Sequence, residues 1–374
     1  MSATTDPLAD PELLATEWDL SPLLEGDVTS GEDRIAAERM LVEARDRSAA
    51  FAGEYAGKVA QLDPDGLQAA MRELEAINDL IGRVGSYASL QFSTDTADPA
   101  RGAMLQLVQE RATEIETLLL FFELEWAAVD DAPAERLLAS DQLERYRHHL
   151  ESVRRYRPHL LSENEEKIFT EKSISSNAAW NRLFGELVAA VRVHVDGEEL
   201  TLDVALSRLQ TADREVRRTA AEAVSEALEP GLRTRGFIYN TLVYDKSVED
   251  RLRNYPHWLA SRNLSNEASD ESVMALIQAV RARFDIPQRW YRLKAKLLGV
   301  DRLADYDRSA PVLREDVTYT FAQSRELVLD TYQSFSPVAG EVTRRFFDGR
   351  WIDAPPRPHK RGGAFCAYTV PSVH

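Results

Sequence analysis

Apolar residues recur at intervals of three and four over most of the chain, the spacing that places them on one face of an α-helix. The clearest case follows Asp98-Pro99, a helix cap with proline at the first helical position. The stripe there consists of Leu105, Val108, Ala112, Ile115, Leu119, Phe122 and Trp126. Such a stripe could be a partner-binding surface, but within a folded chain it is more often core. We therefore predict that the first half of the chain is a helical scaffold.

Cap residues predict further helices along the chain. Ser162-Glu163-Asn164-Glu165 is a capping box, in which the Ser and Glu side chains each satisfy a backbone N–H, and it predicts a helix start. Ser269 caps a later helix, and Gly299 ends the one after it. The apolar residues that share one face of the Ser269 helix are Val273, Leu276, Ile277, Val280 and Phe284.

A β-hairpin interrupts the helical pattern. Apolar and polar residues alternate over 191–195 and again over 198–202, and Asp196-Gly197 between them suits a two-residue turn. Such a turn pairs Val193 with Leu200 and His194 with Glu199. This pairing favours a surface role for His194 over a metal-ligand role.

The last stretch of the chain departs from the helical pattern as well. Gly362-Gly363 follows basic residues and precedes an aromatic and β-branched run, which predicts a turn and then a strand over 364–370. The predicted fold is mainly α, with a small hairpin and this C-terminal strand. The hairpin marks the boundary between a helical N-terminal domain, residues 1–190, and a second domain, residues 191–374.

Charge and cysteine content limit the partners and the compartment. The formal net charge of −17 argues against nucleic acid and anionic membranes, which bind clustered Lys and Arg. Cys366 is the only cysteine, so no intrachain disulfide forms, and we interpret it as a buried structural thiol. No stretch approaches the roughly 18 apolar residues of a membrane span. With no apolar run in the first ten residues, we predict a cytoplasmic protein.

Motifs for hydrolysis are not found among the residues of the chain. None of the seven histidines is followed by glutamate, so the H-E-x-x-H zinc motif is not present, and neither is G-x-S-x-G or a phosphate-binding P-loop. His148 and Glu151 lie one helical turn apart, but without further ligands a solvated helix face explains them better. We therefore assign no catalytic and no metal-binding residue to this chain.

Several segments nevertheless resemble one peptidase family in order and content: the oligoendopeptidase F group of the thimet-oligopeptidase-like zinc metallopeptidases. The segments that carry the resemblance are Trp18-Asp19-Leu20-Ser21, His257–Glu267, Arg292–Val300, Asp305-Tyr306-Asp307 with Ala310-Pro311, and Arg361–Cys366. The resemblance implies a zinc-dependent metalloendopeptidase that cleaves short oligopeptides held between helical lobes.

The resemblance also implies where the chemistry lies. In that family a further strand and the H-E-x-x-H helix follow the final matched segment, so we expect residues 191–374 to be the first part of a catalytic domain, cut before its zinc-binding helix. The chain by itself should then bind no catalytic zinc and cleave nothing. Apolar surface left uncovered should favour aggregation.

The glycine pair suits a substrate groove, because glycine lets another backbone approach closely. We hypothesise that Gly362, Gly363, Ala364, Phe365 and Tyr368 line or support the groove for a peptide. A tight turn leading into a core strand is an equally good interpretation. The neighbouring basic residues Arg357, His359, Lys360 and Arg361 could attract a peptide carboxylate or form a solvated turn.

Two alternatives to the peptidase stay open. A non-catalytic helical peptide-binding or regulatory protein would keep the groove without the reaction. A purely structural helical scaffold would bind no peptide.

Overall fold

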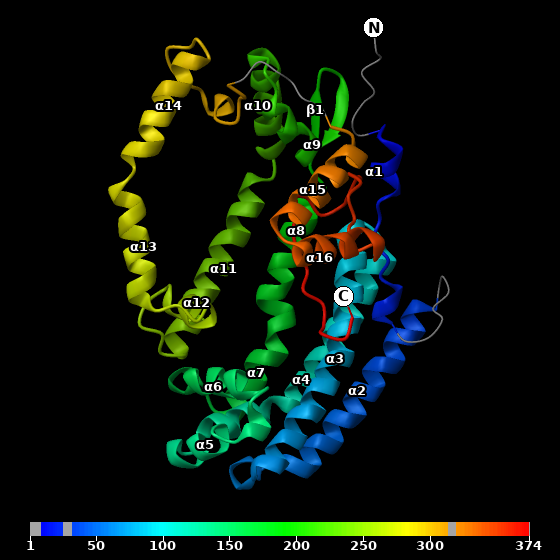
Figure 1. Cartoon of the computed structure of the whole chain (residues 1–374), viewed down its shortest axis with the longest axis vertical. Helices are drawn as coiled ribbons and strands as arrows, with labels where there is room; N and C mark the ends of the chain where they lie inside the picture. The colour runs from blue at the N-terminus through cyan, green and yellow to red at the C-terminus, as the bar shows by residue number, and fades with distance from the viewer. Residues whose placement is uncertain (1–8, 25–31, 313–318, 374) are drawn as a thin grey trace.

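Helices dominate the structure, and the mainly α prediction is confirmed. The computed structural model of the chain describes residues 9–24, 32–312 and 319–373. Three long helices run side by side in the N-terminal lobe: α2 (Asp33–Tyr55), α3 (Pro64–Thr94) and α4 (Pro99–Ala128) (Figure 1). Asp98 caps α4 by accepting hydrogen bonds from the amides of Ala100 and Arg101. The helix start predicted at Asp98-Pro99 is therefore confirmed.

The core of this lobe lies between these three helices. Six of the seven stripe residues of α4 are buried, from Leu105 to Trp126, and Ala112 is half-buried. Trp126 is 1% exposed and its indole Nε1 donates to the Leu150 carbonyl at 2.8 Å. Leu150 belongs to α6 (Arg147–Arg155), which follows α5 (Asp131–Leu138) at the end of the lobe. The stripe is core, as predicted, and each large apolar side chain buried there stabilises the lobe by about 2 kcal/mol.

A kinked helical rod leads from the N-terminal lobe to the hairpin. α7 (Glu163–Ser173) begins at the predicted capping box, where the Ser162 amide donates to Glu165 Oε2 at 2.9 Å. A π-helical turn at Ile174–Ala178 with non-helical angles at Ser176 separates α7 from α8 (Ala179–Ala189). The rod ends at the strands of the hairpin.

The hairpin has the predicted register. β1 (Arg192–Val195) and β2 (Glu198–Thr201) are antiparallel, with Val193 opposite Leu200 and His194 opposite Glu199. Val193 and Val195 are buried in a small second core, which also contains side chains of α9 (Leu202–Ser207) and α10 (Arg214–Leu228). His194 lies 3.8 Å from Glu199 and is exposed. This is the surface pairing that the two-residue turn predicts.

Beyond α10 the chain forms a long helical loop on one side of the molecule (Figure 1). α11 (Leu232–Leu252) leads away from the hairpin, α12 (Ala260–Ser265) turns the chain, and α13 (Asp270–Ala282) and α14 (Asp285–Leu297) return. Ser269 caps α13 as predicted, and Gly299, with φ +69°, follows α14. The apolar face predicted for α13 is not packed into a core, since Leu276 is 65%, Val280 54% and Phe284 51% exposed.

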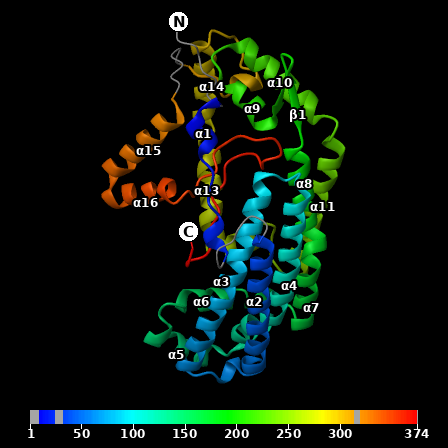
Figure 2. The same cartoon turned by 90° about the vertical axis from the view of Figure 1, so that its right-hand side faces the viewer.

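The C-terminal part returns to the N-terminal lobe. α15 (Phe321–Phe335) and α16 (Pro337–Asp348) form a hairpin that projects to one side of the body (Figure 2), near the short α1 (Pro11–Ala15). The strand predicted over 364–370 is wrong: among the described residues only β1 and β2 form a sheet, so this stretch has no neighbouring strand to pair with. Only an isolated bridge joins Val370 to Val373.

No helix in the described ranges is both long enough and apolar enough to cross a membrane. His374 lies outside the described residues. The division into domains at residues 190 and 191 stays a prediction.

Candidate functional site

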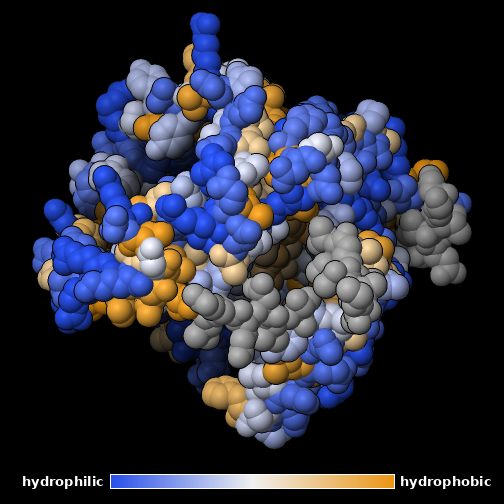
Figure 3. Space-filling view, turned by 90° about the horizontal axis from the view of Figure 1, so that it is seen from above, coloured by the Kyte–Doolittle hydropathy of each residue, from blue (hydrophilic) through white to orange (hydrophobic). Residues whose placement is uncertain are grey.

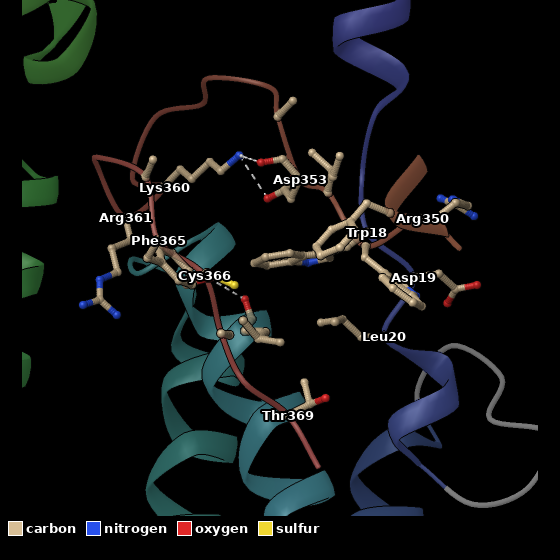
Figure 4. A pocket seen from close by; sticks show the side chains of 18 of the residues that line it. Trp18, Asp19, Leu20, Arg350, Asp353, Lys360, Arg361, Phe365, Cys366 and Thr369 are labelled. Atoms are coloured by element: carbon tan, nitrogen blue, oxygen red, sulfur yellow. Dashed lines mark hydrogen bonds and ion pairs between the residues drawn. The ribbon is translucent and has the colours of Figure 1, made fainter. Parts of the chain in front are cut away.

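A cavity of about 1060 Å³ lies between the N-terminal segment, the end of α3 and the C-terminal segment (Figure 4). Three parts of the chain supply most of its lining residues: Trp18, Asp19, Leu20, Pro22 and Leu23; Leu90 and Ser93 of α3; and most of residues 350–373. All five residues of the predicted groove line it: Gly362, Gly363, Ala364, Phe365 and Tyr368. The structure thus brings the predicted residues together at one cavity. Pockets of this size and mostly apolar character are where proteins hold ligands.

Two segments from opposite ends of the chain form one wall of the cavity. The Asp19 amide donates to the Arg350 carbonyl at 2.8 Å, and the Ala354 amide donates to the Thr16 carbonyl at 2.9 Å. Across the cavity the Trp18 ring meets the Phe365 ring edge to face, with the centroids 6.4 Å apart. Residues 18–21, which contribute to the family resemblance, therefore have a definite place in this wall.

The end of α3 fixes the start of the opposite wall. The Thr96 amide donates to the His359 carbonyl at 2.9 Å, and the Arg361 amide donates to the Ser93 carbonyl at 2.8 Å. These bonds attach the C-terminal segment to the N-terminal lobe. The Arg192 guanidinium lies 3.0 Å from His359 Nε2, which adds a contact with the hairpin.

The glycine pair forms a turn against α9. Gly363 has φ +81°, a backbone conformation that side chains with a Cβ rarely adopt. Its amide donates to Asp203 Oδ1 at 3.2 Å. A Cβ on Gly362 would lie 2.3 Å from Asp203 Oδ2. Sequence reasoning did not identify Asp203, because 160 residues separate it from the glycines and no local pattern marks it.

The stretch after the glycines is exposed along the cavity. Phe365 is 46% and Tyr368 94% exposed. Cys366 is exposed as well, so the interpretation of a buried structural thiol is wrong. The reason is the same as for the missing strand: without a partner strand, residues 364–368 are not enclosed in a core.

The basic residues beside the turn make internal contacts. The Lys360 ammonium lies 3.0 Å from Asp353 Oδ2 and donates to the Asp353 and Pro355 carbonyls (Figure 4). The Asp353 side chain is 1% exposed, so this pair is enclosed in the cavity wall. Arg357 pairs with Glu17, and Arg361 lies over the Phe365 ring at 5.2 Å. Most of these basic residues thus stabilise the cavity wall. This does not favour the alternative in which they attract the carboxylate of a bound peptide.

Three histidines in the described ranges, His148, His194 and His257, each lie beside one carboxylate. His148 Nε2 lies 2.8 Å from Glu267 Oε1, and His257 Nε2 lies 2.8 Å from Asp270 Oδ2. Hydrogen bonds from Arg155 and then from His148 lower the pKa of Glu267. No group of three or more His, Cys, Asp or Glu that could hold a metal is found within residues 9–24, 32–312 and 319–373. The resemblance implies a zinc ion, but these residues do not provide a set of ligands for it. We therefore assign no metal-dependent reaction step to them.

Another segment of the resemblance has a structural role. Asp307 is fully buried and receives hydrogen bonds at 2.9 Å from both Arg214 and Arg217 of α10. Burial opposes its ionisation, but the bonds from Arg214, the Ala304 amide and Arg217 outweigh burial and lower the pKa of Asp307 to about 2. Lys294 of α14 donates to the Arg308 carbonyl at 2.7 Å in the same loop. These residues join α14 to α10.

Comparison with known proteins shows that this chain is similar to oligopeptidases. The Oligopeptidase F family model matches residues 125–192. The chain is 26% identical over 363 residues to group B oligopeptidase PepB of Streptococcus agalactiae, covering 93% of this chain and 58% of that relative. It is 22% identical over 320 residues to oligopeptidase PepF of Bacillus subtilis, covering 83% of this chain and 48% of that relative. The chain therefore spans about half of the length of the curated relatives it matches.

The fold agrees with these matches. The crystal structure of oligoendopeptidase-F from Enterococcus faecium superposes with a TM-score of 0.68 at 19% identity, covering 89% of this chain and 70% of that one. The chain shares its helical fold with this structure and its sequence pattern with the oligopeptidases named above. It is therefore related to the oligoendopeptidase F group, and the resemblance seen in the sequence is confirmed.

Proposed function

We propose that this chain forms the oligopeptide-binding part of an oligoendopeptidase F-type peptidase, and that its site is the cavity bordered by residues 362–368. The observation that carries the proposal is the backbone of this stretch. Within the described part of the chain, its amides and carbonyls make a single hydrogen bond, from the Gly363 amide. Unpaired backbone groups beside an apolar cavity suit an extended peptide, which supplies the missing partners.

The peptidase reaction itself is proposed for the protein in which a zinc ligand set accompanies this chain. Zinc bound by that ligand set would supply the Lewis-acid chemistry for peptide hydrolysis. The names of the relatives support a peptidase, and their family implies zinc. This chain alone is expected to bind no catalytic zinc. Incubation of the purified chain with one equivalent of zinc and a fluorogenic peptide should give no cleavage, and cleavage would overturn this part of the proposal.

Peptide binding is tested by titrating the chain with a tryptophan-free octapeptide. Because Trp18 and Trp351 both line the cavity, saturable binding should change the tryptophan fluorescence, and Trp18→Phe with Trp351→Phe should lose this signal. Calorimetry measures affinity independently of the fluorophore. No binding in either measurement would refute the proposed site.

Gly363→Val tests the role of the turn. Valine is strained at φ +81°, so this variant should displace the stretch that follows and weaken peptide binding. Gly53→Val is the matched control, since a Cβ at Gly53 meets no atom within 4 Å and valine suits a helix better than glycine. Unchanged affinity in a folded Gly363→Val variant would remove the glycine turn from the site.

Non-catalytic peptide binding is the second candidate function. The lack of a metal-ligand group within the described ranges favours it for this chain taken alone. The titration and the cleavage assay together separate the candidates: binding without cleavage fits both this function and the proposed part of a peptidase, while no binding leaves only a scaffold.

A further inference from the structure

The stretch that borders the cavity has one polar anchor between its two ends. Upstream, the Arg361 amide is bonded to α3, and downstream Val370 is bridged to Val373. Over residues 362–368, within the part of the chain that the structure describes, the bond from the Gly363 amide to Asp203 is the only hydrogen bond. The next bond along the chain runs from Thr369 Oγ1 to the Val373 carbonyl. The position of the exposed stretch therefore depends on a carboxylate that belongs to another part of the fold.

Asp203 is well placed for this role. It lies in the first turn of α9, directly after β2, and α9 packs against the hairpin and α10. Its two oxygens act on successive glycines: Oδ1 accepts the Gly363 amide at 3.2 Å, and Oδ2 occupies the space that a Cβ on Gly362 would need. A side chain at 362 would therefore displace the carboxylate from its contact with the Gly363 amide.

We infer that Asp203 is a positioning residue for the peptide site, holding residues 364–368 against the cavity through the glycine turn. The inference rests on the proposed function, because the site it positions is the proposed one. The hairpin and α9 then have a function beyond their own small core: they set one wall of the cavity from the side opposite to α3.

Cys366 provides a direct reporter of this role. It is the only cysteine of the chain, it is exposed, and it lies three residues beyond the anchored amide. A nitroxide attached to it reports the mobility of the stretch by electron paramagnetic resonance, whether or not a peptide binds. Affinity for the octapeptide is measured by calorimetry on the unlabelled chain.

Three variants separate positioning from general destabilisation. Asp203→Ala should mobilise the nitroxide and weaken octapeptide binding about tenfold, the loss expected for one hydrogen bond to a charged group. Asp203→Asn keeps an Oδ1 acceptor and should restore both readouts. Glu199→Ala removes an exposed carboxylate of β2 that pairs with His194, and should change neither.

The glycine at 362 gives a second, independent test. Gly362→Ala should disturb the nitroxide spectrum and binding in the parent chain, because its Cβ displaces the Asp203 carboxylate. In the Asp203→Ala background the space is free, so Gly362→Ala should add nothing. Additive effects of the two changes would overturn the inference.

The outcomes distinguish this inference from the proposed function. An unchanged nitroxide spectrum in folded Asp203→Ala overturns the positioning role. A mobilised spectrum with unchanged octapeptide affinity supports the positioning of the stretch by Asp203 and refutes its placement at a peptide site. Failure of Asp203→Asn to restore the spectrum would also overturn the role assigned to the Oδ1 acceptor.

Discussion

At the scale of single residues, Asp307 is a fully buried charge, and two arginines of α10 donate to its carboxylate. Removing one partner of a buried pair leaves the others uncompensated, which typically costs about 3 kcal/mol. We predict that Asp307→Asn lowers the free energy of unfolding by about this amount in urea titrations at pH 7. Asp305→Asn, an exposed position in the same turn, should change it little.

The same carboxylate predicts an acid limit to stability. The pKa of Asp307 is lowered to about 2, whereas an unfolded Asp titrates near 3.9. Its contribution is therefore fully present above about pH 4 and is lost as the pH falls towards 2. The unfolding free energies of the parent chain and Asp307→Asn should converge over this interval. A difference that stays constant down to pH 2 would contradict the assignment.

Local contacts could be predicted from the sequence, and distant ones could not. The Asp98 cap and the Ser162 capping box were predictable because each side chain bonds to amides within three residues. The bond between Asp203 and Gly363 joins positions 160 residues apart. Asp203 alone is an ordinary acidic residue in the first turn of a helix, and Gly363 alone is an ordinary turn glycine. The predicted groove residues do meet at one cavity, but the carboxylate that holds them was missed for this reason.

At the scale of helices and strands, one ion pair joins α7 to α11. The two terminal guanidinium nitrogens of Arg253, the residue after α11, donate to Glu166 at 2.6 and 2.9 Å. The Glu166 side chain is 8% exposed. Arg253 also pairs with Glu249, which is 41% exposed on its own helix. Arg253 thus has one buried partner, Glu166, and one exposed partner, Glu249. Replacing each partner in turn compares a buried with an exposed ion pair of the same arginine.

We predict that Glu166→Gln weakens the attachment of α7 to α11, and lowers the free energy of unfolding, much more than Glu249→Gln. The enclosed bidentate pair should cost roughly 3 kcal/mol when broken, against about 0.5 kcal/mol for the exposed pair on one helix. Thermal unfolding compares the two variants, and hydrogen exchange of α11 locates the change. Equal losses in the two variants would mean that the enclosed pair does not fix the helices to each other.

The two predicted β segments show when a strand can be predicted from the sequence. Both strands of the hairpin and their turn lie within 191–202, so alternation and turn type were enough to predict the register. The run over 364–370 has similar strand propensity but requires a partner strand from elsewhere, and none lies beside it in the described part of the chain. Propensity indicates an extended stretch, whereas pairing depends on the neighbour.

For the whole molecule, the uneven distribution of apolar surface matters most. The N-terminal lobe encloses its apolar stripes, while α13 and α14 expose theirs. In the view from above, apolar side chains gather on the side where these helices lie in Figure 1 (Figure 3). The large apolar side chains that are at least 40% exposed in these two helices, together with Phe284 between them, are Met274, Leu276, Val280, Phe284, Ile286, Trp290, Tyr291, Leu293 and Leu297. The sequence predicted the apolar face of α13, but periodicity does not reveal whether a face is covered.

Exposed apolar patches of this kind favour self-association. We predict that the purified chain associates in a concentration-dependent manner and binds a hydrophobic dye, as measured by light scattering and fluorescence. Replacing Leu276, Val280 and Phe284 by serine should reduce both signals without lowering the unfolding midpoint, because these side chains are more than half exposed. Ile35→Ser with Val42→Ser is the control: both residues are exposed on α2, outside this patch, and should leave association unchanged. A monodisperse chain that unfolds cooperatively and binds no dye would show that the apolar faces of α13 and α14 are covered in solution.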